Sequence, residues 1–235
     1  AMLDLDEAVR CRELGWNKPI LMLEGFFEPA DIRVFRDYSL WATVHCQEQL
    51  DMLKAAEPGP GLNAMIKLNT GMSRLGFSPS AFTGAYRQAL DEQARGALSI
   101  VGKMTHFARS DDDAQVTEAP FKLFMDVCRD LPGPVSLCNS AATLTPRYWL
   151  WPPPELEQWV RPGICLYGST PFPNQSAEDL GLEPAMTLRS RIISVQEIPA
   201  GQGVGYGHAF VASQPTRVGV VACGYADGYP RHAPN

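Results

Sequence analysis

The sequence predicts an α/β fold built on a parallel sheet, followed by a smaller segment made mostly of β-strands. Short apolar runs alternate with stretches of helical periodicity, and these runs contain few polar residues. Such alternation implies parallel strands joined by crossover helices, and strands that are apolar throughout are covered on both faces. A change of composition after Pro171 predicts the second part.

The elements of the first part follow one another along the chain. A helix is expected over 5–14, where Asp4 and Asp6 load the first turn and Gly15 ends the run. Strands are expected within 19–25, 40–46, 63–70, 97–107, 135–140 and 163–169, and further helices over 28–38, 47–56, 79–94, 118–130 and 140–149. Six strands satisfy an open doubly wound sheet, whereas a closed barrel needs about eight. The strand pattern alone leaves both folds open.

The second part begins with a proline-rich polar connector, PFPNQSAEDLGLEP. Two strands are expected beyond it, over 186–198 and 216–225, with AGQGVGYG as a hairpin turn between them. These are too few strands to close a β domain. We therefore expect a first domain over 1–173, and a connector with the start of a β domain over 174–235.

Composition excludes several classes of protein. The formal net charge is −6, which offers no basic face for a nucleic acid, and no apolar run approaches the roughly 20 residues of a membrane span. No secretory signal is visible at the N-terminus, and the six cysteines form no CxxC pair. We expect a cytoplasmic protein with reduced thiols, no metal cluster and no nucleic-acid or membrane partner.

Candidate reactive residues come where the predicted strands end: Lys67, Arg74, His106, Ser140 and Arg161. Barrel geometry would bring them together, because the loops after the strands form one face. Each also has a purely structural interpretation. Lys67 fits an edge lysine reaching solvent, His106 a hydrogen-bonded structural histidine, and Ser140 a helix N-cap, a position that also suits a phosphate.

The order of several motifs, however, resembles one family. LMLEGFF, KLNTGMSRLGF, MTHFA, CNSAATL, RPGICLYG, VGYG and GYADGYPRHAP together resemble the bacterial alanine racemases, especially the catabolic branch. The resemblance covers nearly the whole chain. It implies an N-terminal (β/α)8 barrel of the TIM type that carries pyridoxal 5′-phosphate, a mostly-β C-terminal domain and a head-to-tail homodimer.

The resemblance also implies roles for the residues around the cofactor. Arg161 would hydrogen-bond the pyridine nitrogen, and His106 would connect Arg161 to the catalytic tyrosine and lower the pKa of that tyrosine. Ser140 and the backbone of Gly163 and Ile164 would hold the phosphate. The implied reaction interconverts L- and D-alanine by two-base proton transfer at Cα of a pyridoxal-phosphate aldimine.

Three further residues act on the substrate side in this scheme. Arg74 would contact the phenolic oxygen of the cofactor and the substrate carboxylate. Lys67 resembles the family's carbamylated lysine, whose negative charge positions Arg74. Tyr225, which composition alone would make a packing residue, matches the tyrosine that serves as one of two opposed bases and reaches the barrel site of the partner subunit.

The family's other base is a lysine in a segment resembling VVKANAYGHG, and the sequence contains no such segment. The family's chain extends past both ends of this one, and its extra part includes two barrel strands, which with the six expected here make eight. We therefore expect residues 1–235 alone to be inactive. A broader-specificity amino-acid racemase of the same fold, and a non-catalytic pyridoxal-phosphate-binding barrel protein, remain as alternatives.

Overall fold

A computed structural model describes residues 1–57, 59–150 and 156–231 of the chain. The contacts divide it into two compact units, which we call the barrel unit (residues 1–185) and the C-terminal unit (residues 186–235). Contacts thus group the connector 174–185 with the barrel unit. No helix in the described ranges is both long and apolar enough to cross a membrane.

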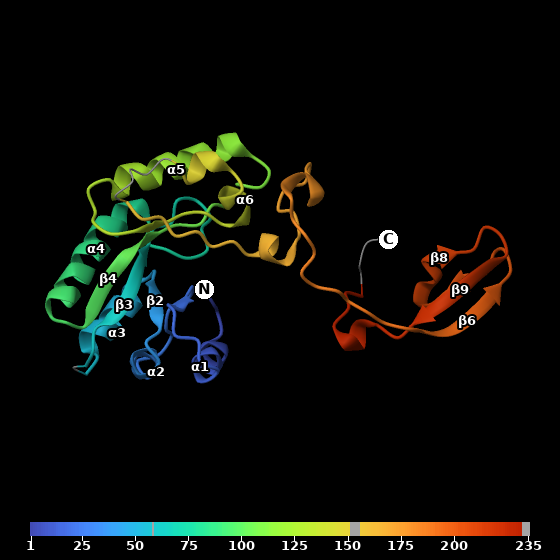
Figure 1. The fold of residues 1–235 in the computed structure, drawn as a ribbon, viewed down its shortest axis with the longest axis horizontal. Coiled ribbons are helices and arrows are strands. Elements are labelled where there is room, and N and C mark those ends of the chain that lie inside the picture. The colour runs from blue at the N-terminus through green and yellow to red at the C-terminus, as the bar shows by residue number, and fades with distance from the viewer. Residues whose placement is uncertain (58, 151–155, 232–235) are drawn as a thin grey trace. The chain divides into compact units, whose positions relative to one another are not determined.

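The barrel unit contains five parallel strands in chain order, β1-β2-β3-β4-β5 (Figure 1). The strands are β1 (Leu21–Met22), β2 (Trp41–Val44), β3 (Leu62–Lys67), β4 (Leu98–Met104) and β5 (Val135–Ser136). The helices are α1 (Leu5–Glu13), α2 (Asp31–Asp37), α3 (Gln47–Ala55), α4 (Pro79–Ala94), α5 (Ala114–Cys128) and α6 (Ser140–Thr143). A parallel sheet with alternating helices was predicted from the sequence, and it is confirmed.

Helix boundaries follow local signals. The Asp4 side chain caps α1, and Gly15, with a φ of +93°, follows its last turn in the left-handed conformation that favours glycine. Helix α5 begins four residues before the expected start at Glu118, because the Asp113 side chain accepts from the backbone N–H of Val116 and adds a turn.

The expected sixth strand at 163–169 is wrong. Residues Ile164–Tyr167 form a 3₁₀ helix instead. Residues just before this 3₁₀ helix lie beside β5 instead. Gln158 makes a parallel bridge with Val135, and the Trp159 N–H donates to the Val135 carbonyl oxygen at 2.8 Å. The apolar composition of GICLYG predicts a strand, but the residues that pair with the edge of the sheet precede this segment.

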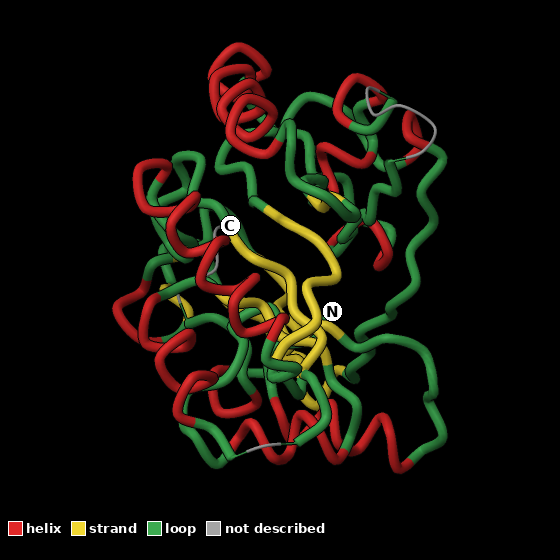
Figure 2. Tube along the Cα trace, turned by 90° about the vertical axis from the view of Figure 1, so that its left-hand side faces the viewer, coloured by secondary structure: helices red, strands yellow, loops and turns green. Residues whose placement is uncertain are grey.

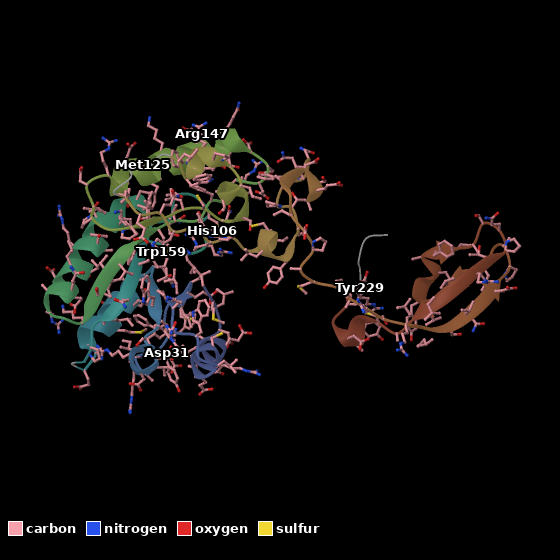
Figure 3. All side chains as sticks on the ribbon, viewed as in Figure 1. Asp31, His106, Met125, Arg147, Trp159 and Tyr229 are labelled. Carbon is pink, nitrogen blue, oxygen red and sulfur yellow. The ribbon has the colours of Figure 1, made fainter. Side chains whose placement is uncertain are left out.

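The two faces of the sheet have different partners. One face carries Ala42, Val44, Ala64 and Ile66 into the main core, which it shares with the helices outside the sheet (Figures 1 and 2). The other, inner face carries a small cluster of Leu21, Met65 and Met104, against which Trp41 and Trp159 pack. Figure 3 shows His106 and Trp159 on this inner side, whereas Met125 and Arg147 lie among the helices.

A β-bulge shifts the register between β3 and β4 just before the carboxyl ends of these strands. Ala64 pairs with Ile100 but Met65 pairs with Gly102, so β4 has one extra residue at this point. Gly102 has a φ of +155°, and a Cβ there would lie 2.7 Å from the Pro134 carbonyl oxygen. Only glycine fits, and beyond the bulge the end of β4 lies in register with Lys67 of β3 and Ser136 of β5.

The C-terminal unit is rich in strands. Strands β6 (Ile192–Ile198) and β9 (Thr216–Val221) pair antiparallel. They lie within the two strands expected over 186–198 and 216–225, and each is shorter than expected. The AGQGVGYG segment is more than a turn, because it contributes β7 (Gly203–Val204), which pairs with β8 (Phe210–Val211) as a second small hairpin. A 3₁₀ helix over Tyr225–Asp227 follows β9.

Candidate active site

A row of inner-face residues runs across the sheet at the carboxyl ends of the strands. Lys67 of β3 pairs with Met104 of β4, and Met104 pairs with Ser136 of β5. Side chains at neighbouring positions of parallel strands point to the same face. Lys67 is only 4% exposed and Ser136 only 1%, so two polar side chains are buried in one row beneath the strand ends.

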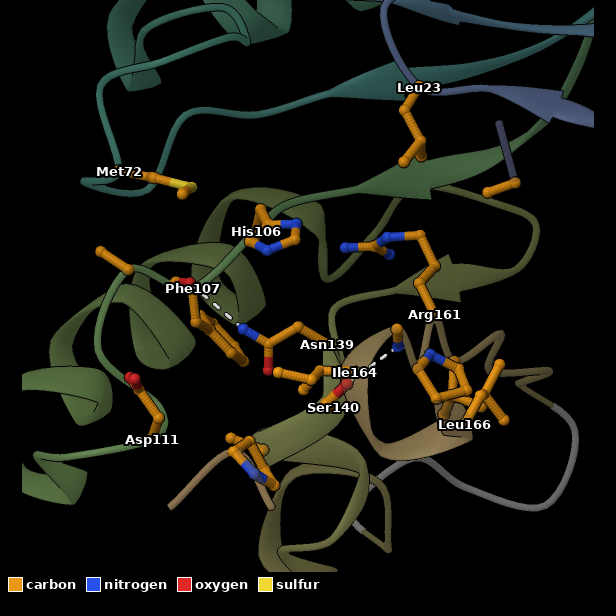
Figure 4. A pocket seen from close by; sticks show the side chains of 17 residues that line it. Leu23, Met72, His106, Phe107, Asp111, Asn139, Ser140, Arg161, Ile164 and Leu166 are labelled. Carbon is orange, nitrogen blue, oxygen red and sulfur yellow. Dashed lines mark hydrogen bonds between the residues drawn. The ribbon is translucent and has the colours of Figure 1, made fainter. Parts of the chain in front are cut away.

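A pocket of about 650 Å³ opens at these strand ends (Figure 4). The predicted site residues in its wall are His106, Ser140, Arg161, Gly163 and Ile164. They come from the loops after β4 and β5 and from the segment beside β5, as expected for a barrel whose strand ends form one face.

The Arg161 side chain is held by hydrogen bonds to neutral groups. Nη2 donates to the Thr105 carbonyl oxygen at 2.6 Å, and Nη1 donates to Ser136 Oγ. The Arg161 backbone N–H donates to the Cys138 carbonyl oxygen at 2.8 Å. Nε is shielded from solvent and has no hydrogen-bond partner among the described residues. Burial lowers the pKa of Arg161 to about 10, which leaves it charged at neutral pH.

Ser140 joins two loops of the pocket wall. Its Oγ accepts from the backbone N–H of Gly163 at 2.8 Å and, more weakly, from that of Cys165 at 3.5 Å. It is not the helix N-cap expected from the sequence. Asn139 caps α6 by accepting from the Ala142 N–H, so Ser140 is the first helical residue. Because Ser140 Oγ is the acceptor in both of its hydrogen bonds, its proton remains free to donate.

Several positive or basic groups face one another here. Burial, and then the charges of Arg161 and Arg74, lower the pKa of Lys67 to about 8, with Glu24 opposing the shift. Burial and the same two arginines, together with Lys67, lower the pKa of His106 to about 4. His106 is therefore neutral at pH 7. The site has a surplus of positive charge that suits an anionic ligand.

Arg74 lies outside this buried group. Asn69 shapes its loop by accepting from the N–H groups of Gly71 and Ser73, both at 3.0 Å. The Arg74 side chain is exposed, and its guanidinium makes no hydrogen bond or ion pair with the described parts of the chain. It is near enough to shift the pKa values of Lys67 and His106, and its charge is available to a ligand.

Tyr225 belongs to the C-terminal unit and is described there alone. It begins the 3₁₀ helix Tyr225–Asp227, is 66% exposed, and has the Arg231 guanidinium 5.9 Å from the centre of its ring. Gly224 donates its backbone N–H to Asp227 Oδ2 at 2.9 Å, which fixes the turn that presents the tyrosine. The motif GYADGYPRHAP ends in residues 232–234, which lie outside the described residues.

Sequence reasoning missed the groups that hold Arg161. The sequence predicts only that Ser136 and Thr105 belong to the strands within 135–140 and 97–107. Thr105 also shares a hydrogen bond of 2.8 Å with Thr70 through their side-chain oxygens, which links the loop of Arg74 to the end of β4. One feature of the sequence could have revealed Ser136: it is a polar residue within a short, otherwise apolar strand, where buried positions are usually apolar.

The donors fit a ligand with a ring acceptor and an anionic end, such as pyridoxal 5′-phosphate. Arg161 has an unused N–H for a ring nitrogen, and Ser140 has an unused proton for a phosphate oxygen. A Cβ on Gly163 would meet only Ser140 Oγ, at 3.9 Å, so the glycine leaves open space beside that hydroxyl. Fold and site together define an α/β-barrel protein with a pocket at its strand ends whose lining suits an anionic small molecule.

Comparison with known proteins identifies the family. A sequence model described as "Alanine racemase, N-terminal domain" matches residues 1–171, and one described as "Alanine racemase, C-terminal domain" matches residues 185–235. The chain belongs to the alanine racemase family. This confirms the resemblance, and with it a barrel-type parallel sheet followed by a strand-rich domain.

Individual relatives agree with this assignment. The alanine racemase of Bordetella avium is 57% identical over 233 residues, which are 99% of this chain and 62% of the relative's length. That of Ralstonia nicotianae is 49% identical over 99% of this chain and 60% of its own length. The crystal structure of the biosynthetic alanine racemase from Pseudomonas aeruginosa matches with a TM-score of 0.87 and 38% identity, covering 99% of this chain and 63% of that chain. The chain thus spans about three fifths of the length of the relatives it matches.

Proposed function

We propose that the protein is a pyridoxal-phosphate-dependent alanine racemase that interconverts L- and D-alanine by two-base proton transfer. The observation that carries the proposal is the state of Arg161. Its guanidinium is fixed by Ser136 and Thr105, and it keeps a buried, unpartnered Nε in the wall of a pocket that Ser140 and Gly163 also line. A pyridoxal-phosphate-dependent racemase would use such an N–H to hold the ring nitrogen of its cofactor.

Four residues would hold the cofactor. Arg161 Nε would donate to the pyridine nitrogen, and because an arginine does not readily lose its proton, that nitrogen would stay unprotonated. Ser140 Oγ and the backbone N–H of Ile164 would bind the phosphate, and the Gly163 N–H would join them by exchanging its bond to Ser140 Oγ for one to the phosphate. When bound, pyridoxal phosphate withdraws electrons from the bonds of Cα and makes the Cα proton acidic.

Arg74 and Lys67 would act as a charged pair beside the substrate. The pKa of about 8 leaves Lys67 partly neutral at physiological pH, and a neutral amine can add carbon dioxide. The new N–C bond forms as the amine loses one proton to solvent, and the resulting carbamate is an anion near Arg161 and Arg74, which removes the cost of burying an ammonium ion there. The carbamate would orient Arg74 toward the carboxylate of alanine.

Tyr225 would be one of the two bases and would act in the barrel site of a partner subunit, so the proposal includes a homodimer. His106 would hydrogen-bond to this tyrosine as a neutral imidazole, as its pKa of about 4 indicates. The positive charge that lowers the pKa of the tyrosine is then that of Arg161. One base removes the Cα proton from one face while the conjugate acid of the other returns a proton from the opposite face.

We further infer that a polypeptide limited to residues 1–235 forms no D-alanine. No segment resembling VVKANAYGHG occurs in the sequence, and in the resemblance that segment carries the lysine that is the other base and binds the cofactor covalently. D-alanine formation by this polypeptide would contradict the inference. A cytoplasmic location also remains a prediction, supported by six cysteines that are all free thiols.

The test is racemisation by a purified longer protein that contains residues 1–235 together with a segment resembling VVKANAYGHG, supplied with pyridoxal phosphate; the variants discussed below are made in that protein. We expect L-alanine to be converted to D-alanine, measured by chiral chromatography, faster than L-serine, L-lysine or L-arginine. A higher rate with one of the other amino acids would favour a broader-specificity racemase. Cofactor binding with no turnover of any of them would favour a non-catalytic pyridoxal-phosphate-binding barrel.

A further inference from the structure

Ser136 holds an unusual position between two groups. It is 1% exposed, it lies on the inner face at the end of β5, and it is not among the residues that line the pocket. Its hydroxyl contacts the Trp159 carbonyl oxygen at 2.7 Å and the Arg161 guanidinium through Nη1. Of these two partners, only Arg161 lines the pocket.

The hydrogen-bond roles of this hydroxyl are fixed by its neighbours. A serine hydroxyl has one proton and two lone pairs. The Trp159 carbonyl can only accept, so the Ser136 proton is committed to it. Only lone pairs remain for Arg161 Nη1, which can only donate, so the serine is an oriented acceptor.

The hydrogen bonds of Arg161 Nη1 and Nη2 determine the direction in which Nε points. The guanidinium is planar, so bonds from Nη1 to Ser136 and from Nη2 to the Thr105 carbonyl set the direction of the Nε–H bond. Both acceptors are neutral, and no carboxylate forms an ion pair with Arg161 in the ranges 1–57, 59–150 and 156–231. The positive charge is thus oriented without being neutralised.

We propose that Ser136 is a positioning residue, which aims Arg161 Nε at the ring nitrogen of the bound cofactor and leaves the arginine charge uncompensated. The inference rests on the proposed function, because it takes pyridoxal phosphate as the ligand. The serine touches neither cofactor nor substrate. Its effect passes entirely through the guanidinium.

The test compares two ligands that differ only at the ring nitrogen: pyridoxal phosphate and its 1-carba analogue, in which CH replaces that nitrogen. Dissociation constants for both are measured on the apoprotein by fluorescence titration. The original protein should prefer pyridoxal phosphate. Ser136→Ala should weaken pyridoxal phosphate binding roughly tenfold, as expected for the loss of one oriented bond to a charged group, and change binding of the analogue less than threefold.

The control is Ser78→Ala, which removes another serine hydroxyl, the N-cap of α4, from a residue that does not line the pocket. It should leave both dissociation constants unchanged, and thermal melting checks that both variants are folded. Equal weakening of the two ligands by Ser136→Ala, or no weakening of either, would overturn the positioning role. If the original protein binds pyridoxal phosphate no better than the carba analogue, the assigned Arg161 contact is itself wrong. If it binds neither ligand, the proposed function fails as well.

Discussion

The indole rings of Trp41 and Trp159 pack together with their centres 5.1 Å apart and their planes tilted by 32°. Trp41 is in β2, and Trp159 lies in the segment beyond β5, so three strands stand between them in the sheet. In a flat sheet, four strand spacings would separate them by at least about 19 Å. The sheet is therefore strongly curled, and this contact spans its inner face.

Removing this contact should loosen the curled sheet. We expect Trp159→Ala to lower the free energy of unfolding by about 2–4 kcal/mol, because it deletes a large ring from the inner cluster and leaves Trp41 without its partner. Urea unfolding followed by circular dichroism measures the change. Trp16→Ala is the matched control, since Trp16 is 54% exposed and should cost less than about 1 kcal/mol. Equal effects of the two variants would contradict a role for the pair in holding the curvature.

Lys103 offers a second test, on the opposite face of the sheet. It is 1% exposed, and its Nζ donates to the carbonyl oxygens of Leu131, Pro132 and Gly133 at 2.6, 3.0 and 2.6 Å. Lys103→Met should destabilise the fold by about 2–4 kcal/mol, because it leaves three inward-facing carbonyls without their donor. Lys54→Met, at an exposed position of α3, should change stability by less than about 0.5 kcal/mol. A Lys103→Met variant as stable as the original would show that water satisfies these carbonyls.

Periodicity predicts the parallel sheet and its helices because each apolar run is covered on both faces. It places the sixth strand wrongly, since the segment beside β5 contains two polar residues, Gln158, which donates to the Tyr148 carbonyl oxygen, and Arg161, which lines the pocket. The apolar run after this segment forms a 3₁₀ helix. The family motifs contain the residues of the pocket wall. They do not reveal Lys103 or Ser136, whose partners lie 23 to 30 residues away and meet them only in the folded chain.

The depressed pKa of His106 predicts a loss of stability in acid. The pKa is about 4 in the folded chain and 6.5 in a free histidine, so between these values the unfolded state binds more protons. Stability should therefore fall as the pH drops from about 7 to 4. Comparison with His106→Gln at each pH isolates this histidine from the carboxylates, and the original should lose about 1–3 kcal/mol relative to the variant. Parallel pH curves for the two proteins would contradict the depressed pKa.

Lys67 should carry a carbamate at neutral pH in the presence of bicarbonate. Its pKa of about 8 supplies the neutral amine, and the arginines beside it stabilise the anion formed. With ¹³C-labelled bicarbonate, a carbamate signal in the ¹³C NMR spectrum should be present in the original protein and absent in Lys67→Ala. Lys103→Met should retain the signal, because the carbonyl oxygens around Lys103 repel an anion. A signal that survives Lys67→Ala would assign the carbamate to another amine.

Tyr225 should be required for proton transfer but not for cofactor binding. Tyr225→Phe removes only the hydroxyl, and loss of a general base should slow racemisation by about a hundredfold or more while the dissociation constant of pyridoxal phosphate stays within twofold. Tyr229→Phe is the matched control, since it removes a hydroxyl from the other tyrosine of the same motif, which is 49% exposed. Because one face of Cα would lose its base, the variant should still exchange the Cα proton of one enantiomer with solvent, measurable in deuterated water. Equal exchange of both enantiomers, or unchanged turnover, would remove Tyr225 from the reaction.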